Sequence, residues 1–116
     1  MKHRSFNYLR AYRKRWSLSE EDVAGFLGAA TSGFISRFES GKRTPPLEVV
    51  LAYEVVFGIP ARVLFPDLYE AVEEAVMGRA AELSVEFEAQ SDHASLRKRQ
   101  LLADMVKRAG GNAAEL

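Results

Sequence analysis

The chain of 116 residues contains no cysteine. It therefore forms no disulfide, no zinc–thiolate site and no thiol nucleophile. Its two histidines, His3 and His93, lie ninety residues apart and lack the spacing that is typical of metal ligands. We expect neither a metal site nor any other cofactor.

Long apolar segments are also lacking. The longest uninterrupted run extends from Val49 to Tyr53, well short of the ~18 residues that a membrane span requires. The basic residues Lys2 and Arg4 are not followed by the apolar stretch of a signal peptide. These absences predict a cytoplasmic protein without a membrane partner.

The usual signatures of catalysis are missing as well. Gly41-Lys42-Arg43-Thr44 lacks the upstream glycine of a phosphate-binding loop. Asp92-His93 stands at an expected helix start, where capping is the simpler role. We expect no catalytic residue and do not expect an enzyme.

No alternating strand pattern and no Asn-Gly or Asp-Gly hairpin turn occur. Apolar residues instead recur three or four positions apart, which predicts an all-α protein. The expected helices cover residues 5–15, 19–27, 31–40, 45–57, 61–64, 67–90 and 91–108. We place a first domain at residues 1–65 and a helical extension at residues 66–116.

Several residues predict where these helices begin and end. The Ser19 hydroxyl is expected to cap the second helix, with Asp22 at the third position of a capping box, and Gly28 suits its end. The fourth helix is expected to begin with Pro45 or Pro46 and to stop at Gly58. Ser91 or Asp92 is expected to cap the last helix, which should end at Lys107 and Arg108, before Gly110-Gly111.

The zero net charge hides an uneven distribution. Residues 1–43 carry nine Lys/Arg against four Asp/Glu, whereas residues 44–92 carry two against ten. Residues 93–116 are again basic, with five against two. A local basic segment is the usual sign of a nucleic-acid partner, so the first segment is the place to look.

The two short helices at 19–27 and 31–40, joined by a short connection, form the pattern of a helix-turn-helix. The chain resembles the lambda-repressor/Cro-like (Xre-type) helix-turn-helix family over roughly residues 5–65. The resemblance rests on Leu9-Arg10-Ala11-Tyr12-Arg13, Leu18 to Ala24, Leu27-Gly28, Ile35-Ser36-Arg37-Phe38-Glu39-Ser40-Gly41-Lys42-Arg43, Pro46-Leu47-Glu48, Gly58-Ile59-Pro60 and Leu64-Phe65.

This resemblance implies a five-helix DNA-binding domain, operator binding as a dimer and a role in transcriptional regulation. Two departures bear on DNA binding. Glu20 stands where the family usually has a glutamine that helps to hold a phosphate, and its carboxylate would repel the DNA backbone unless it turns away. Six residues instead of the usual five, residues 29–34, separate Gly28 from Ile35.

The third helix supplies the candidate base-contacting residues. At about 100° per residue, Ile35 and Phe38 lie on the core side. The opposite side carries Gly33, Ser36, Arg37 and Ser40. For Arg37 we favour a guanine or a phosphate over a purely solvated role, whereas Ser36 fits DNA contact and plain surface polarity equally well. Ser32 either caps the helix or touches a phosphate, and capping is favoured.

Neighbouring residues are expected to support this face. Phe34 is expected to be half-buried packing, with contact to a thymine methyl group as the alternative. Lys42 and Arg43 are expected to contact phosphates, and Arg10, Lys14 and Arg15 to add to the positive field.

The resemblance assigns a structural role to Arg13 and Glu39, which should form a partly buried ion pair between the first and third helices. Glu54 lies on the same side of its helix as apolar residues, and we expect an arginine partner for it. That helix is apolar on more than one face, which predicts that it is covered on all sides.

The 67–90 helix has an apolar stripe formed by Val72, Val76, Ala80, Leu83 and Phe87. We expect a homodimer with the C-terminal helices in its interface. The basic cluster Arg97-Lys98-Arg99 is expected to be a solvated helix face, with DNA contact or pairing with the acidic helix as alternatives.

The leading hypothesis is a sequence-specific double-stranded DNA-binding regulator, in particular a repressor. The alternative is an antitoxin or another module whose C-terminal helices hold a protein partner, and Glu20 is the feature that favours it.

Overall fold

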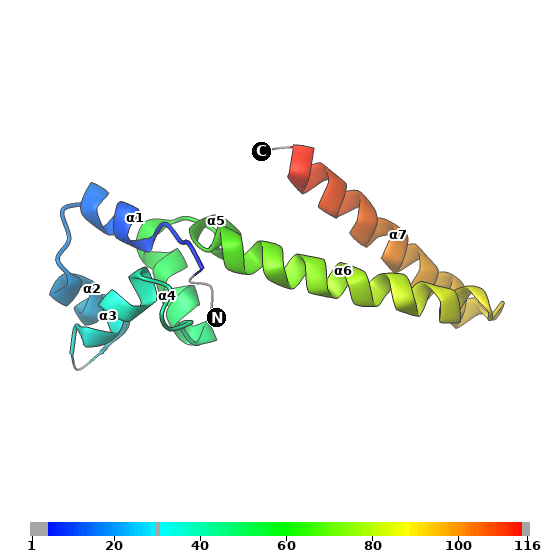
Figure 1. The fold of residues 1–116 in the computed structure, drawn as a ribbon, viewed down its shortest axis with the longest axis horizontal. Coiled ribbons are helices and arrows are strands. Elements are labelled where there is room, and N and C mark those ends of the chain that lie inside the picture. Colours follow the sequence, from blue (N-terminus) through cyan, green and yellow to red (C-terminus); the bar gives the residue numbers. More distant parts are fainter. Residues whose placement is uncertain (1–4, 30, 115–116) are drawn as a thin grey trace. The chain divides into compact units, whose positions relative to one another are not determined.

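The computed structural model describes residues 5–29 and 31–114, and these residues form helices and no strand. The chain is thus all-α in its described part, as Figure 1 shows. The helices are α1 (Leu9–Arg15), α2 (Glu20–Leu27), α3 (Gly33–Glu39), α4 (Leu47–Phe57), α5 (Ala61–Leu64), α6 (Pro66–Glu88) and α7 (His93–Ala114).

The chain divides into two compact units, one up to Tyr69 and the other from Glu70 onward. The division lies inside α6, a few residues beyond the boundary at 65 and 66 that the sequence suggested. In the described part of the chain, no helix combines the length and the apolar content needed to cross a membrane.

The first unit is built around one apolar cluster. Helix α2 contacts both α3 and α4, while α1 contacts α3 and α4 contacts α5 (Figure 1). Each helix contributes at least one fully buried side chain, and burial of these side chains is the main favourable term that holds the helices together. The buried cluster consists of Leu9, Val23, Ala24, Ile35, Phe38, Tyr53, Leu64 and Phe65.

Helix α2 begins and ends as its sequence predicts. The Ser19 hydroxyl accepts a hydrogen bond from the Asp22 N–H at 3.0 Å, and the Asp22 carboxylate accepts one from the Ser19 N–H at 2.9 Å. These bonds lower the pKa of Asp22. Gly28 and Gly58 end α2 and α4 in the left-handed conformation, with φ of 70° and 68°.

Helix α1 begins at Leu9, later than the predicted Ser5, because the preceding residues bond to distant parts of the chain. The Asn7 carboxamide accepts from the Leu9 N–H at 3.0 Å and donates to the Phe38 carbonyl at 2.9 Å. The Tyr8 N–H donates to the Leu64 carbonyl at 2.9 Å. Gly41, with φ of 76°, leaves room for the backbone of Ser5, which a Cβ atom there would overlap.

Two proline-led starts differ slightly from the predictions. Pro46 precedes α4 as its N-cap residue, and Leu47 is the first helical residue. Helix α6 begins with Pro66, which suits a first position because it has no N–H to leave unpaired. Asp67 is therefore the second residue of the helix and not its cap, and its carboxylate accepts a hydrogen bond from the Phe6 N–H at 2.9 Å.

The prediction of an arginine partner for Glu54 is wrong. Its carboxylate accepts a hydrogen bond from the N–H of Ala61, the first residue of α5, at 2.9 Å. Among the described residues, no Lys or Arg lies within ion-pair distance of it. A helix N-terminus presents unpaired N–H groups and partial positive charge, so it stabilises this half-buried carboxylate without a cation.

Within the first unit, helix α4 is not covered on all sides. Tyr53 faces the core of the first unit, whereas Leu47, Leu51 and Val55 remain exposed, Val55 by 84%. These three residues recur every fourth position and therefore lie along one side of α4.

The second unit consists of α6 from Glu70 onward and α7. Around the turn between them, the buried hydroxyl of Ser95 hydrogen-bonds with the side chains of Gln90 and Asp92. Its bond to Asp92 lowers the pKa of that carboxyl group. Helix α7 begins directly after Asp92 but continues through Gly110 and Gly111 to Ala114, so its predicted end at Arg108 is wrong. Each glycine costs a helix only about 1 kcal/mol, which disfavours a helical conformation without preventing it.

Candidate nucleic-acid interface

The outward side of α3 is polar and open. Ile35 and Phe38 are buried beneath it, while Gly33, Ser36 and Arg37 are exposed. Ser40 is the half-buried C-cap residue of the helix, and its hydroxyl donates a hydrogen bond to the Arg37 carbonyl at 3.2 Å. Arg37 thus lies on an exposed helix face that it shares with the small residues Gly33 and Ser36. Small neighbours allow another molecule to approach this face closely.

Ser32 occupies the N-cap position of α3, but its side chain makes no capping hydrogen bond. The favoured capping role is therefore wrong. The backbone at Ser32 is helical rather than extended, so its side chain does not approach the first N–H groups of the helix in the usual way. The Ser32 carbonyl accepts from the Ile35 N–H at 3.1 Å.

Phe34 lies between the side chains of Phe38 and Arg43. Its ring lies nearly parallel to that of Phe38, with centroids 6.4 Å apart. The Arg43 guanidinium lies over the Phe34 ring, 4.6 Å from its centroid, a cation–π contact. The Arg43 N–H also donates to the Arg37 carbonyl at 3.2 Å. Phe34 is still 40% exposed, so it presents an apolar edge beside the polar face of α3.

Basic side chains of α1 lie close to Glu39 and Ser40 at the C-terminal end of α3. Arg10 and Lys14, one helical turn apart, line a groove of about 520 Å³ together with Ser40 and residues 5–7. Both are exposed, as is Lys42, which follows α3. Positive charge is therefore present on the helix before α2 and on the segment after α3. Lys and Arg so placed are suited to phosphate oxygens.

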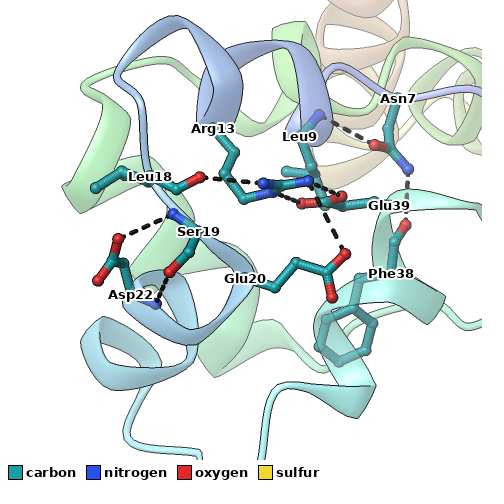
Figure 2. A network of polar contacts seen from close by, with 9 residues as sticks. All are labelled: Asn7, Leu9, Arg13, Leu18, Ser19, Glu20, Asp22, Phe38 and Glu39. Carbon is teal, nitrogen blue, oxygen red and sulfur yellow. Dashed lines mark hydrogen bonds and ion pairs between the residues drawn. The ribbon is translucent and has the colours of Figure 1, made fainter.

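Arg13 and Glu39 join α1 to α3 (Figure 2). The Arg13 Nε donates to Glu39 at 2.6 Å, and its terminal nitrogens donate to the other Glu39 oxygen at 3.1 Å and to the Leu18 carbonyl at 3.0 Å. The side chains are only 11% and 6% exposed. Hydrogen bonding to Glu39 raises the pKa of Arg13, which keeps the guanidinium charged. The bidentate geometry fixes the orientation of the two helices.

Glu20 turns toward this ion pair. One of its carboxylate oxygens lies 3.9 Å from Arg13, and its side chain remains 38% exposed (Figure 2). Arg13 therefore partly offsets a negative charge that would otherwise face outward at the start of α2. This contact was not predictable from spacing along one helix, because Arg13 belongs to α1 and Glu20 to α2.

The side chain of Tyr53 is almost completely buried, close enough to Arg13 and Glu39 for their charges to affect its pKa. Among the described residues, none offers a hydrogen-bond partner to its hydroxyl. Burial raises the pKa of Tyr53 above its usual value of 10.0, and the charge of Glu39 adds to this effect. The hydroxyl thus stays protonated beside Arg13 and Glu39.

We expect the substitution Tyr53→Phe to raise the free energy of unfolding by about 1 kcal/mol, because it removes a buried polar atom that lacks a partner. The raised pKa adds a pH dependence. The folded state holds the Tyr53 proton more tightly than the unfolded chain does. The wild type therefore loses stability as the pH rises beyond 10, whereas the phenylalanine variant lacks this loss. Urea unfolding at pH 7 and above pH 10 measures both effects. If the wild type and Tyr53→Phe lost equal stability at high pH, the expected pH dependence would be contradicted.

The described residues contain no group of three or more acidic or histidine side chains positioned to hold a metal ion. Comparisons with protein-family models, with curated proteins and with solved structures found no match. The resemblance drawn from the motifs therefore stays a prediction.

Proposed function

We propose that this protein is a cytoplasmic, sequence-specific double-stranded DNA-binding regulator of transcription, in its simplest form a repressor that binds its operator as a homodimer. In this proposal, α1–α5 form a helix-turn-helix domain of the lambda-repressor/Cro-like (Xre-type) kind. Helix α3 enters the major groove, and its neighbours contact the backbone.

The observation that carries the proposal is the exposed face of α3, where Arg37 stands among Gly33, Ser36 and Ser40. A major groove admits one helix, and an arginine on such a helix reaches the acceptor atoms of guanine. In this proposal, the exposed basic residues Arg10 and Lys14 of α1 and Lys42 and Arg43 after α3 contact phosphates. Buried positions on the inner side of α3 hold this face in place.

Selection from a randomised duplex pool tests the proposal. The full chain is incubated with the pool at low and at moderate salt, and bound sequences are read out over several rounds. We expect an enriched inverted repeat with half-sites about one helical turn apart, and an affinity that falls as salt rises. A matched single-stranded pool should show no such enrichment. Failure to enrich any duplex at either salt concentration would overturn the proposal.

A protein-binding module remains the second candidate, and one observation favours it. Helices α6 and α7 leave several large apolar side chains exposed, among them Val85 and Val106. Under this alternative, the chain would enrich no DNA sequence but would form a stable complex with a second, different protein. The selection experiment therefore separates the two candidates.

We expect Glu20→Gln to strengthen DNA binding about fivefold, which corresponds to about 1 kcal/mol. Glu20 is only partly offset by Arg13, so its remaining charge repels nearby phosphates. Stability should change little, because half-exposed ion pairs contribute less than about 1 kcal/mol. Fluorescence anisotropy with the selected operator gives the affinity, and Glu48→Gln, an exposed carboxylate on α4, is the charge-matched control. An equal gain in both variants would show a general charge effect instead.

A further inference from the structure

The unit from Glu70 onward has almost no core of its own. Of its described side chains, only Ala80 and Ser95 are buried. Helix α6 exposes Val72, Val76 and Leu83, which recur four and seven positions apart and therefore lie along one side. They are 53%, 40% and 43% exposed. We call these three residues the α6 stripe.

Two helices that bury so little cannot offset the conformational entropy lost in ordering them. Helical segments in proteins are stabilised mainly by packing of an apolar face, and small helical units commonly obtain it by oligomerisation. On the apolar side of α6, Ala80 is buried and Phe87 half-buried within the unit, whereas the α6 stripe stays exposed. It therefore needs a partner surface.

The charges of the two helices indicate which partner this is. From Glu70 onward, α6 carries six glutamates and a single basic residue, Arg79. Helix α7 carries five basic residues and a single acidic one, Asp104. Among the described residues, no ion pair joins the two helices. Lys98 of α7 lies over the Phe87 ring of α6, 5.3 Å from its centroid, whereas Arg97, Lys107 and Arg108 are exposed. Most charges of the two helices are therefore available to another molecule.

Such a surface is complementary to itself. A two-fold axis brings each patch of one subunit against the matching patch of the other. Helix α6 of one copy then lies against α7 of the second, and the same contact occurs twice. An unrelated partner would have to match an acidic and a basic helix separately, whereas a second copy does so by symmetry.

We infer that the α6 stripe is covered by the α6–α7 unit of a second copy of this chain, with acidic α6 of each copy against basic α7 of the other. This inference identifies the interface of the proposed homodimer. It rests on the proposed function only in that operator binding is the purpose of the dimer. The pairing itself is measured without DNA.

Sedimentation equilibrium of the full chain tests the interface. The wild type should sediment at twice the chain mass of 13.0 kDa. The double substitution Val76→Glu and Leu83→Glu places charges in the stripe and should raise the dissociation constant by about 30-fold or more. Val85→Glu is the matched control, because Val85 is 69% exposed on the other side of α6. It should leave the dimer intact.

Three outcomes would overturn the inference: a monomeric wild type, an unchanged dimer in the double variant, or equal weakening by Val85→Glu. A monomeric wild type would mean that the stripe is covered within one chain. These outcomes are independent of the DNA selection. A dimer that enriches no DNA would contradict the proposed function alone, and a monomer that enriches DNA would contradict the interface alone.

Charge reversal tests the pairing of α6 with α7 even if the double variant fails to fold. One chain carries Glu74→Lys, Glu82→Lys and Glu88→Lys, which changes α6 from Glu70 onward from five net negative charges to one net positive charge. A second chain carries Arg97→Glu, Lys107→Glu and Arg108→Glu, which makes α7 acidic. Each alone should self-associate more weakly than wild type, because its two helices then carry the same sign of charge. Mixing the two should restore a dimer that contains one of each. Absence of this mixed dimer would contradict the inference.

Discussion

Replacing Arg13 by alanine should lower the free energy of unfolding by about 3–5 kcal/mol. The substitution leaves the Glu39 carboxylate, 6% exposed, without a cation, and it removes the hydrogen bond to the Leu18 carbonyl. A buried charge without a partner is among the most costly defects in a folded protein. Since a small domain is stable by only about 5–15 kcal/mol, a large share of the total would be lost.

Urea unfolding at neutral pH measures this effect. Arg15→Ala, an exposed arginine at the end of the same helix, is the matched control and should change stability by less than about 0.5 kcal/mol. Arg13→Lys should remain clearly destabilised, because an ammonium group cannot form the bidentate contact. Equal effects of Arg13→Ala and Arg15→Ala would show that the ion pair does not hold α1 against α3.

The double substitution Arg13→Met and Glu39→Leu separates the ion pair from the packing around it. Replacing both charges by apolar side chains removes the unpaired carboxylate, so much of the loss should be recovered. Titration of Arg13 does not complicate the comparison. Hydrogen bonding to Glu39 raises the pKa of Arg13, so the guanidinium is charged at neutral pH, where the variants are compared. Its stabilising effect is lost as the pH rises from the usual arginine pKa through the raised one.

Local chemistry made several features of the fold predictable from sequence. The Ser19 and Asp22 capping box and the helix end at Gly28 depend on residues a few positions apart, and the structure contains both. The all-α class followed from apolar periodicity, which is likewise a local property.

The errors share a different cause, which is contact between residues far apart in the chain. Asn7 delays the start of α1 because it also bonds to the Phe38 carbonyl, thirty-one positions away. The Glu54 carboxylate accepts a hydrogen bond from the Ala61 N–H instead of pairing with an arginine, because the turn at Gly58 brings the start of α5 close to it. Glycines at 110 and 111 suggested a helix end, yet glycine only weakens a helix.

In the candidate site, too, local features were predictable and contacts between distant residues were not. The exposure of Gly33, Ser36 and Arg37 was predictable from helical geometry once Ile35 and Phe38 were assigned to the core. The stacking of Arg43 on Phe34 and the turn of Glu20 toward Arg13 were not, because neither follows from spacing along one helix. An aromatic residue at a helix start followed by an arginine just beyond its end is the only sequence sign of that stack.

Replacing Arg37 by alanine should weaken binding to the selected operator by about 1–3 kcal/mol, which is roughly 5- to 150-fold. Arg37 lies on the exposed face of α3, and its side chain makes no ion pair among the described residues. Stability should change little, because an exposed arginine contributes little to folding. The guanidinium is therefore free to serve a ligand, and its loss should appear in DNA affinity rather than in unfolding.

Salt dependence distinguishes a base contact from a phosphate contact. If Arg37 contacts a guanine, Arg37→Ala should relax the preference at one operator position and leave the salt slope nearly unchanged. Lys42→Ala, an exposed cation just after α3, is the comparison variant. It should weaken all sequences uniformly and reduce the salt slope by about one. No other exposed side chain on α3 carries a charge. If Arg37→Ala bound DNA with wild-type affinity and wild-type sequence preference, the proposal that α3 enters the major groove would be contradicted.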